Sequence, residues 1–380
     1  MEQDLPPGPL AVYLHIPFCL SRCGYCSFFS VPFSRGALSV YLRNLHHEID
    51  LFTERDPSLL QAKTLYFGGG TPSLLGAEEL NSLSARFQLV PGAEVTLEVN
   101  PLQITADYLR QLNETPVNRL SIGVQSLDDQ ELEYLGRRHR AAQIPDKIRL
   151  CREHGYPNIS LDLIYGLPGS SVASLRRNLH QFITLEPEHL SCYLLTLEED
   201  SPLGLKLSAG ETQPLPEDDV LAAQYDALRQ ELRDAGFEQY EISNFCRPGK
   251  ASRHNLAYWK SEPYLGLGAS ASGWLPPWRY ANPSSLEEYS RVLAEGEIMP
   301  QAEFCGPERT RADYLMMGLR LREGIDLNAY QERFGADLFA ERRPQIDKLL
   351  ALHMLESSPS RLWLSERALF VSNAVIGGLL

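Results

Sequence analysis

Short runs of apolar and β-branched residues alternate with longer amphipathic stretches through the first two thirds of the chain. The predicted strands are Ala11–Ile16, Thr64–Phe67, Glu94–Val99, Arg119–Val124, Ile159–Tyr165 and His189–Leu197. The predicted helices between them are Ala37–Leu51, Ala77–Phe87, Ala106–Leu112, Ile144–His154 and Ser171–Thr184. A strand followed by a helix, repeated in this way, predicts an α/β fold with a parallel sheet and right-handed crossovers.

Several of these strands are nearly all apolar, which is typical of a sheet covered on both faces or closed into a barrel. Polar, glycine and cysteine residues gather where the strands end. These segments are Pro17-Phe18-Cys19, Gly68-Gly69-Gly70-Thr71-Pro72, Glu98-Val99-Asn100-Pro101, Gln125-Ser126, Gly166-Leu167-Pro168-Gly169 and the neighbourhood of Thr196 and Glu198. In a β/α barrel the carboxyl ends of the strands build the active site, so the pattern predicts one shared site there.

The strand–helix alternation weakens after about residue 200. Residues 260–285 are rich in Gly, Pro, Ser and Trp and are predicted to form a boundary or a lid. From Pro307 the chain is mostly helical, and a helix over Asp347–Leu355 precedes a short strand at Leu362–Leu364. Helices with a short terminal hairpin predict a small winged-helix-like module.

The composition is that of an ordinary globular protein. Of 380 residues, 43% are hydrophobic and 22% are charged, and the formal net charge is −14, which argues against a general nucleic-acid-binding protein. The negative net charge does not exclude a local basic pocket for a carboxylate-bearing ligand. No apolar run has membrane-spanning length, and the acidic, Pro-rich segment Met1–Pro7 lacks the features of a signal peptide. We therefore expect a cytoplasmic protein without a transmembrane segment.

Seven cysteines, an odd number, argue against a disulfide framework. Four of them are scattered and are expected to be small buried apolar residues: Cys151, Cys192, Cys246 and Cys305. The other three, Cys19, Cys23 and Cys26, have the spacing C-x3-C-x2-C.

Three thiolates on one tight loop can occupy three corners of a [4Fe–4S] cubane, because thiolates are the usual ligands of iron–sulfur clusters. The fourth iron is then open to a chelating small molecule, and S-adenosylmethionine (SAM) offers an amino group and a carboxylate. An electron from the cluster would cleave a C–S bond of SAM and yield a 5′-deoxyadenosyl radical, while the protein positions and shields the reactants. The alternatives are a structural zinc site, which needs a fourth ligand, and three unrelated cysteines. No second C-x2-C follows.

Residues beyond the cysteine loop fit a SAM site. The glycines of Gly68–Gly70 would let the ligand approach the backbone closely, although a glycine triplet alone is also typical of a turn. Glu98 and Asp162 are carboxylates within apolar strands, and Gln125 lies between them in sequence; buried ion pairing is the alternative role. Arg137 is either a surface charge or the partner of the SAM carboxylate through a bidentate fork.

Four segments together resemble the HemN/HemW group of radical SAM proteins. They are Tyr13-Leu14-His15-Ile16-Pro17-Phe18-Cys19, Gly68-Gly69-Gly70-Thr71-Pro72-Ser73, Ser121-Ile122-Gly123-Val124-Gln125-Ser126 and Asp162-Leu163-Ile164-Tyr165-Gly166-Leu167-Pro168. The resemblance runs from about residue 10 to the C-terminus. It implies a partial (β/α)6 barrel with the cluster and SAM site over residues 1–275 and a smaller, mostly helical C-terminal domain over residues 276–380.

The same resemblance implies which residues bind SAM. They are Tyr13, Gly69, Gly70, Thr71, Glu98, Gln125, Arg137, Asp162 and, through its backbone, Thr196. The group includes oxygen-independent coproporphyrinogen III oxidases, HemW heme chaperones and related methyltransferases, so finer features must choose among these functions.

Three positions bear on that choice. The oxidases carry a further cysteine two residues after the triad, whereas this chain has Phe28 at that position. HemW proteins have a similar aromatic residue there. His254-Asn255-Leu256-Ala257-Tyr258-Trp259 matches the HNxxYW motif proposed for heme binding in HemW-type proteins. This motif makes His254, Tyr258 and Trp259 heme-binding candidates; a structural histidine with two packing aromatics is the alternative. Ser272 stands where many HemW proteins carry a histidine, which favours the oxidases.

The leading interpretation is therefore a HemW-like heme chaperone that binds heme, a [4Fe–4S] cluster and SAM and delivers heme to acceptor proteins. The alternatives are an oxygen-independent coproporphyrinogen III oxidase of porphyrin biosynthesis, which Phe28 makes doubtful, and a radical SAM methyltransferase. The barrel would be able to cleave SAM reductively, and its electron donor would be a flavodoxin or ferredoxin. The sequence does not determine the oligomeric state.

Overall fold

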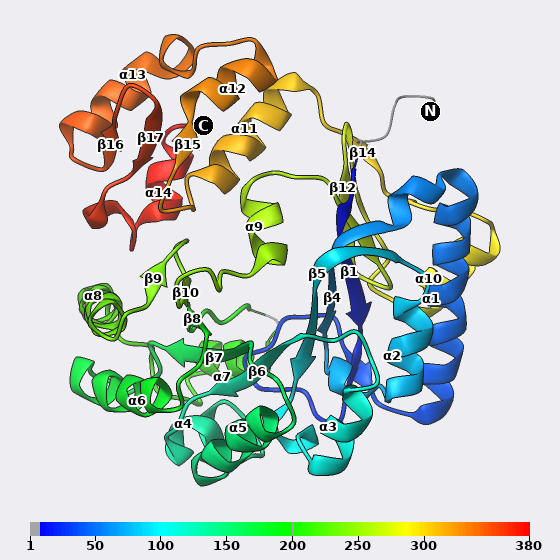
Figure 1. The fold of residues 1–380 in the computed structure, drawn as a ribbon. Helices are drawn as coiled ribbons and strands as arrows, with labels where there is room; N and C mark the ends of the chain where they lie inside the picture. Colours follow the sequence, from blue (N-terminus) through cyan, green and yellow to red (C-terminus); the bar gives the residue numbers. More distant parts are fainter. Residues whose placement is uncertain (1–7, 200) are drawn as a thin grey trace.

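The computed structural model describes residues 8–199 and 201–380 and is built on a 12-stranded sheet (Figure 1). In spatial order the strands are β14 (Glu303–Phe304), β13 (Trp278–Ala281), β12 (Ser272–Leu275), β11 (Tyr264–Leu267), β1 (Leu10–Ile16), β4 (Gln61–Gly69), β5 (Gln88–Val99), β6 (Arg119–Gln125), β7 (Ile159–Tyr165), β8 (His189–Leu194), β10 (Asn244–Cys246) and β9 (Glu238–Gln239). In this order the six strands β1, β4, β5, β6, β7 and β8 are parallel to one another, which confirms the predicted partial (β/α)6 barrel.

Helices follow the parallel strands and lie around the outside of the curved sheet (Figure 1). They are α1 (Arg35–Arg55), α2 (Ala77–Ser84), α3 (Ala106–Leu112), α4 (Asp129–Tyr134), α5 (Ile144–Glu153), α6 (Val172–Thr184) and α8 (Asp218–Asp234), whereas α7 (Pro202–Ser208) contacts Gly24 through Leu203. The predicted helices match α1, α2, α3, α5 and α6 to within a few residues. Side-chain caps explain several starts: Ser34 accepts from the Ala37 amide and Thr105 from the Tyr108 amide.

The two faces of the barrel strands differ in polarity. In β6, Leu120, Ile122 and Val124 belong to the apolar core, whereas the alternate residues, Arg119, Ser121, Gly123 and Gln125, line a cavity. Because successive strand side chains point to opposite faces, one face of β6 packs on the core while the other is polar. Strand β8 ends at Leu194, three residues before the predicted end, and the next residues turn so that Thr196 also reaches the cavity.

Residues 260–285 do not form the predicted boundary or lid. They contain β11, which pairs in parallel with β1, and the β12–β13 hairpin. Their glycines permit close strand packing: a Cβ on Gly266 would lie 1.9 Å from the Ser272 carbonyl oxygen, and one on Gly273 would lie 2.2 Å from the Tyr280 ring. Since β13 and β14 continue the large sheet past residue 275, we propose a domain boundary near residue 306.

The C-terminal module combines helices with a small antiparallel sheet of order β15-β17-β16. Its elements are α11 (Pro307–Gly318), β15 (Ile325–Asp326), α12 (Leu327–Phe334), α13 (Leu338–Ala351), β16 (Leu355–Ser357), β17 (Arg361–Leu364) and α14 (Ser372–Gly377). The hairpin of β16 and β17 confirms the predicted winged-helix-like module. The helix predicted over Asp347–Leu355 starts and ends earlier, since His353, with φ 56°, breaks the helical path before β16.

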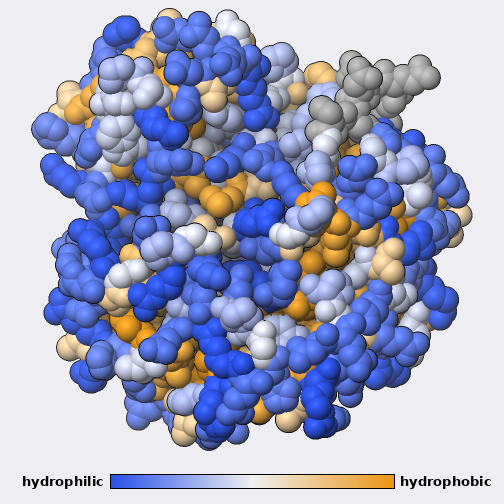
Figure 2. Space-filling view, viewed as in Figure 1, coloured by the Kyte–Doolittle hydropathy of each residue, from blue (hydrophilic) through white to orange (hydrophobic). Residues whose placement is uncertain are grey.

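Helix α9 (Arg253–Trp259) joins the barrel to this module (Figure 1). The Arg320 guanidinium lies over the Trp259 ring, 4.6 Å from its centroid, and forms an ion pair with the buried Glu241. The helix α10 (Leu286–Ala294) packs on α1. The visible surface is mostly hydrophilic, with separate small hydrophobic areas (Figure 2). None of the described helices combines the length and hydropathy needed to cross a membrane.

Candidate functional site

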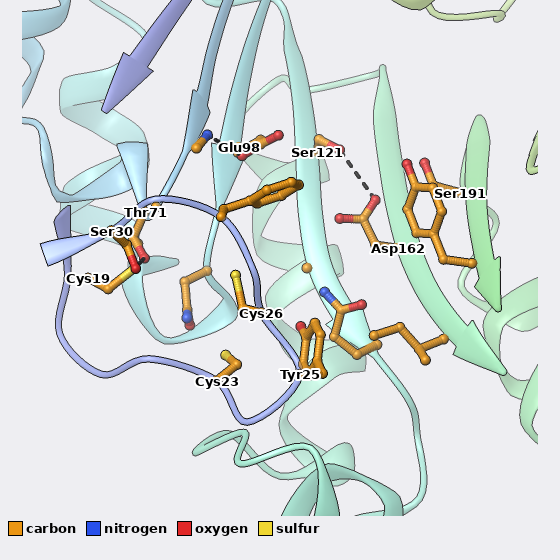
Figure 3. A pocket seen from close by; sticks show the side chains of 18 of the residues that line it. Cys19, Cys23, Tyr25, Cys26, Ser30, Thr71, Glu98, Ser121, Asp162 and Ser191 are labelled. Atoms are coloured by element: carbon orange, nitrogen blue, oxygen red, sulfur yellow. Dashed lines mark hydrogen bonds between the residues drawn. The ribbon is translucent and has the colours of Figure 1, made fainter. Parts of the chain in front are cut away.

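A cavity of about 390 Å³ opens inside the barrel, and the predicted site residues surround it (Figure 3). Its walls come from the cysteine loop and from β4, β5, β6, β7 and β8 with the loops that follow them. Residues from the predicted strand ends therefore share one cavity.

The cysteine loop is held at both of its ends. Cys19 lies in the short strand β2 (Phe18–Cys19), which pairs with β3 (Val31–Pro32) beyond the loop. Further along, the Gly24 amide donates to the Leu135 carbonyl oxygen over 3.2 Å, and the Gly24 carbonyl oxygen accepts from the Leu203 amide over 2.8 Å. These bonds fix the segment that carries Cys23 and Cys26.

The three thiol groups are half-buried and free of disulfides, and two of them accept hydrogen bonds. Arg137 Nη1 donates to Cys23 Sγ over 3.3 Å, and Thr71 Oγ1 donates to Cys19 Sγ over 3.6 Å. Hydrogen bonds to sulfur stabilise the thiolate form and tune the potential of a bound cluster.

The glycine segment Gly68–Gly70, at the end of β4, lies close to the cysteine loop. Gly69 has φ 112°, a conformation that side chains disfavour, and a Cβ there would lie 2.6 Å from the His15 ring. A Cβ on Gly70 would lie 2.8 Å from the backbone of Phe18. Only glycine fits at these two positions, so the chain keeps a narrow backbone wall next to Cys19.

Glu98 on β5 and Asp162 on β7 reach the cavity on either side of β6 (Figure 3). Glu98 accepts hydrogen bonds from the Tyr66 hydroxyl over 2.9 Å and the Gly69 amide over 3.1 Å. Burial raises the pKa of Glu98 to about 7, and the charge of Asp162 contributes to the rise. Burial also raises the pKa of Asp162 to about 6, against the lowering effect of Arg119. Two half-buried carboxyl groups with raised pKa values are suited to receive a cationic or hydroxyl-rich ligand.

Gln125 is the last residue of β6 and has φ 71°, the left-handed region that a non-glycine residue rarely adopts. The strained backbone coincides with a register shift between β6 and β7. The Gln125 side chain lies beside Gly123, where an added Cβ would be 3.0 Å from Gln125 Nε2. Backbone strain of this kind gathers at functional sites, where the surroundings hold it in place.

The structure brings together all but one of the residues predicted for SAM. The cavity is lined by Gly69, Gly70, Thr71, Glu98, Gln125, Arg137, Asp162 and Thr196. Tyr13 lies outside this lining: its ring stacks on Tyr66 at 6.0 Å and its hydroxyl bonds to His15 Nδ1. In this structure Tyr13 therefore packs against other side chains outside the cavity lining, and its contact with SAM stays a prediction.

The HNxxYW residues lie on α9, and His254 is only 1% exposed. Its Nδ1 is 2.8 Å from Thr64 Oγ1 and its Nε2 is 2.8 Å from the Tyr258 hydroxyl. Burial lowers the pKa of His254 to about 3, so the ring is neutral. Both ring nitrogens are engaged, as expected for the structural alternative; a role in heme binding stays a prediction for His254, Tyr258 and Trp259.

Sequence reasoning did not single out several cavity residues. These are Tyr25, Ser30, Tyr66, Arg119, Ser121, Ser191, Tyr193 and Asn255. A signal was present in β6, where Arg119, Ser121, Gly123 and Gln125 recur at every second position. The same period places Ser191 and Tyr193 together on β8.

The donors around the cavity fit a cluster with an attached small molecule. Three free thiols share one loop, and the buried Nε of Arg137 has no hydrogen-bond partner among the described residues. Among all the residues that the structure describes, no group of three or more His, Cys, Asp or Glu side chains is arranged to hold a single metal ion. The assignment of the cluster to Cys19, Cys23 and Cys26 thus rests on their spacing, their loop and the open cavity beside them.

Comparisons with known proteins agree with the site and the fold. Residues 13–181 match the model of the radical SAM superfamily, and residues 312–371 match the HemN C-terminal domain. The chain is 35% identical to the heme chaperone HemW of Mycobacterium tuberculosis, over 99% of this chain and 96% of that protein. It is 32% identical to the heme chaperone HemW of Bacillus subtilis, over 97% and 99%.

The fold is also that of a solved structure, the coproporphyrinogen III oxidase HemN of Escherichia coli. The TM-score is 0.83 at 22% identity, over 98% of this chain and 90% of that chain. Since the sequence relatives are matched along nearly their whole length, the chain belongs to the HemN/HemW family of radical SAM proteins, which implies a [4Fe–4S] cluster and SAM.

Proposed function

We propose that this protein is a heme chaperone that binds heme, holds a [4Fe–4S] cluster with SAM, and delivers heme to acceptor proteins. Two lines of support carry the proposal. The full-length relatives of 32–35% identity are named heme chaperones, and Phe28 occupies the position of the oxidases' further cysteine. A flavodoxin- or ferredoxin-type protein is proposed as the electron donor.

Phe28 is the observation that favours the chaperone over the oxidase. Its side chain is 62% exposed and lines the cavity together with Cys26. An exposed aromatic face at the mouth of a cavity offers a flat apolar contact to a porphyrin. A thiol at this position would be able to take part in redox or radical chemistry, and a phenyl ring offers no such group.

The chain's own residues have separable tasks at the cavity. When bound, the cluster and SAM would supply one-electron chemistry at the sulfonium. Cys19, Cys23 and Cys26 would hold the cluster, and Arg137 holds Cys23 and a carbonyl of β6 together. Glu98 and Asp162 would bind the polar groups of SAM, while Gly69 and Gly70 keep the backbone close to it.

The heme ligand within the protein is open to test. Iron ligation by His254 would require release of its hydrogen bond to Thr64 or to Tyr258. We keep His254, Tyr258 and Trp259 as candidates, and the experiment below includes a variant of the first.

The test supplies the anaerobically reconstituted protein with heme in one arm and with coproporphyrinogen III, SAM and reductant in the other. We expect a 1:1 heme complex and no protoporphyrinogen. Decarboxylation at a rate comparable to an oxidase, or no saturable heme binding, would overturn the proposal.

Matched variants locate the contacts. Phe28→Ala is expected to weaken heme binding about tenfold, as loss of an aromatic contact does, while Phe304→Ala, at another exposed phenylalanine on β14, leaves it unchanged. The position of the heme absorbance band in His254→Ala, compared with His180→Ala on the exposed face of α6, shows whether His254 binds iron.

A further inference from the structure

Arg119 is a buried guanidinium without a partner. It is the first residue of β6, is only 2% exposed and lines the cavity. Its Nε has no hydrogen-bond partner, and none of the ion pairs among the residues that the structure describes involves Arg119. A buried charge left without a partner is strongly unfavourable, so its retention calls for an explanation.

Another buried arginine shows the usual arrangement. Arg229 on α8 is 7% exposed, donates from Nε to Gln239 over 2.9 Å, and forms an ion pair with Glu366. Arg119 instead shares the wall of the cavity with the polar residues Ser121, Ser191, Tyr193 and Asn255. Tyr193 keeps 44% of its surface exposed although it belongs to a central strand, so space remains in front of it.

The charge of Arg119 affects nearby titratable groups, but no ion pair neutralises it. It lowers the pKa of both Glu98 and Asp162, although neither forms an ion pair with it. It also lowers the pKa values of the buried His189 and His254, both of which burial already keeps neutral. No other cationic side chain among the described residues lines this end of the cavity, since Arg22 and Arg137 lie with the cysteine loop.

SAM bound at the cluster does not account for Arg119. The cysteine loop contacts the other end of β6, where Arg137 bonds to Gly123. Arg119 and Gln125 are the first and last residues of this strand, about 20 Å apart along an extended chain. A carboxylate that chelates a cluster held by the cysteine loop would therefore lie nearer to Arg137 than to Arg119.

We propose that Arg119, with Asn255 and Tyr193, forms a second binding site that takes the carboxylate of another ligand inside the barrel. A guanidinium binds a carboxylate through two parallel hydrogen bonds, and the amide and phenol add polar contacts. The site as a carboxylate site is independent of the proposed function. The identification of its ligand as a porphyrin propionate, rather than a free aliphatic acid, rests on that function.

This site also gives the HNxxYW motif a structural task. Glu94 accepts from the backbone amides of Arg253 and His254, over 3.2 and 3.0 Å, and His254 binds Thr64. These bonds fix the start of α9 on β4 and β5, and the next residue, Asn255, lines the cavity. The histidine thus holds the asparagine at the wall of the cavity that the arginine also lines.

The test compares binding of heme with that of heme dimethyl ester, whose propionates are esterified. We expect the wild-type protein to prefer heme at least tenfold and Arg119→Gln to lose this preference. Asn255→Ala should reduce it, and Arg119→Lys should keep part of it. Arg177→Gln, at an exposed position of α6, is the control that should keep all of it. Circular dichroism and thermal melting show that each variant is folded.

Equal binding of heme and its ester by the wild type, or a preference that survives in folded Arg119→Gln and Asn255→Ala, would overturn a propionate site. If the wild type binds neither compound, the proposed heme function fails, and glutarate then tests the carboxylate site alone. A saturable rise in melting temperature with glutarate, lost in Arg119→Gln and reduced in Asn255→Ala, supports a site for a free acid. The same rise in those variants, or none in the wild type, overturns the site.

Discussion

The guanidinium of Arg137 donates to the sulfur of Cys23 over 3.3 Å and, from its other nitrogen, to the Gly123 carbonyl oxygen over 2.6 Å. One side chain thus connects the cysteine loop to β6, at a point two residues before Gln125, the last residue of that strand. The loop and the cavity wall are positioned together, and a change at Arg137 should affect both.

Arg137→Gln should weaken SAM binding about 10- to 100-fold, because hydrogen bonds from a charged donor contribute roughly 1.5–3 kcal/mol. Equilibrium dialysis with the reconstituted protein measures this affinity. Arg138→Gln, at the exposed neighbouring position, should bind SAM as the wild type does. Equal losses in the two variants would show that general charge, rather than the contact, is responsible.

Cys23→Ala should abolish the broad absorbance near 400 nm that thiolate-bound iron–sulfur clusters show, roughly to the level of the apoprotein. Iron and sulfide analysis after anaerobic reconstitution gives the second readout. Cys305→Ala, at a buried cysteine outside the cavity, should retain the cluster. Full iron content in Cys23→Ala would show that the ligand assignment is wrong.

Glu98 should make the apoprotein less stable as the pH rises. The native pKa of Glu98, about 7, exceeds its ordinary value of 4.5, so the folded state binds the proton more tightly than the unfolded state. This contribution to stability is fully present below pH 4.5 and is lost as the pH rises through 7.

Between pH 5.5 and 8, the free energy of unfolding of the wild type should therefore fall by about 2 kcal/mol relative to Glu98→Gln. Urea unfolding at several pH values measures the difference. Glu133→Gln, at an exposed position, is the control and should run parallel to the wild type. Parallel curves for Glu98→Gln as well would contradict a raised pKa.

Gln125→Gly should stabilise the apoprotein by up to about 1 kcal/mol, since glycine adopts the left-handed backbone without strain. The same change should weaken SAM binding, because the amide side chain is lost from the cavity wall. Glu186→Gly, at an exposed residue with φ 52°, should gain stability without any loss of SAM binding. An unaltered SAM affinity in Gln125→Gly would remove this residue from the binding site.

His254→Ala should lower the free energy of unfolding by about 2–4 kcal/mol, because it leaves Thr64 and Tyr258 without their partner and opens a cavity beside Tyr66. Tyr258→Phe removes one hydrogen bond and should cost about 1 kcal/mol. Chemical denaturation of both variants tests this, and wild-type stability in His254→Ala would exclude the structural role.

The sequence predicted the site wherever chemistry-bearing residues ended apolar strands. Glu98, Gln125 and Asp162 stood out because each interrupts or ends such a run, and the cavity contains all three. Arg119 was overlooked because it opens its strand, where a charged residue is ordinarily read as the solvated end. Its burial is a property of the assembled barrel, in which Arg119 pairs with Thr96 of β5 and lines the cavity.

The misread stretch over residues 260–285 has a related cause. Glycine-rich composition is typical of loops, but Gly266 and Gly273 lie within strands. Because they have no side chain, Ser272 and Tyr280 can approach their backbone closely. Similarly, the motif around His254 shows which residues are present but not that Thr64, 190 positions earlier, engages the ring. Such pairings depend on the completed sheet and leave no local pattern.

Strand β1, near the start of the chain, lies between β4 and β11. During synthesis on the ribosome its first partner, β4, follows it closely, but the second, residues 264–267, emerges roughly 10–40 s after β4 at 5–20 residues per second. Through that interval one row of its backbone amide and carbonyl groups is exposed, and such a row readily pairs with other chains. The nascent protein should therefore depend on chaperone protection, or on slow expression, until the central sheet is complete.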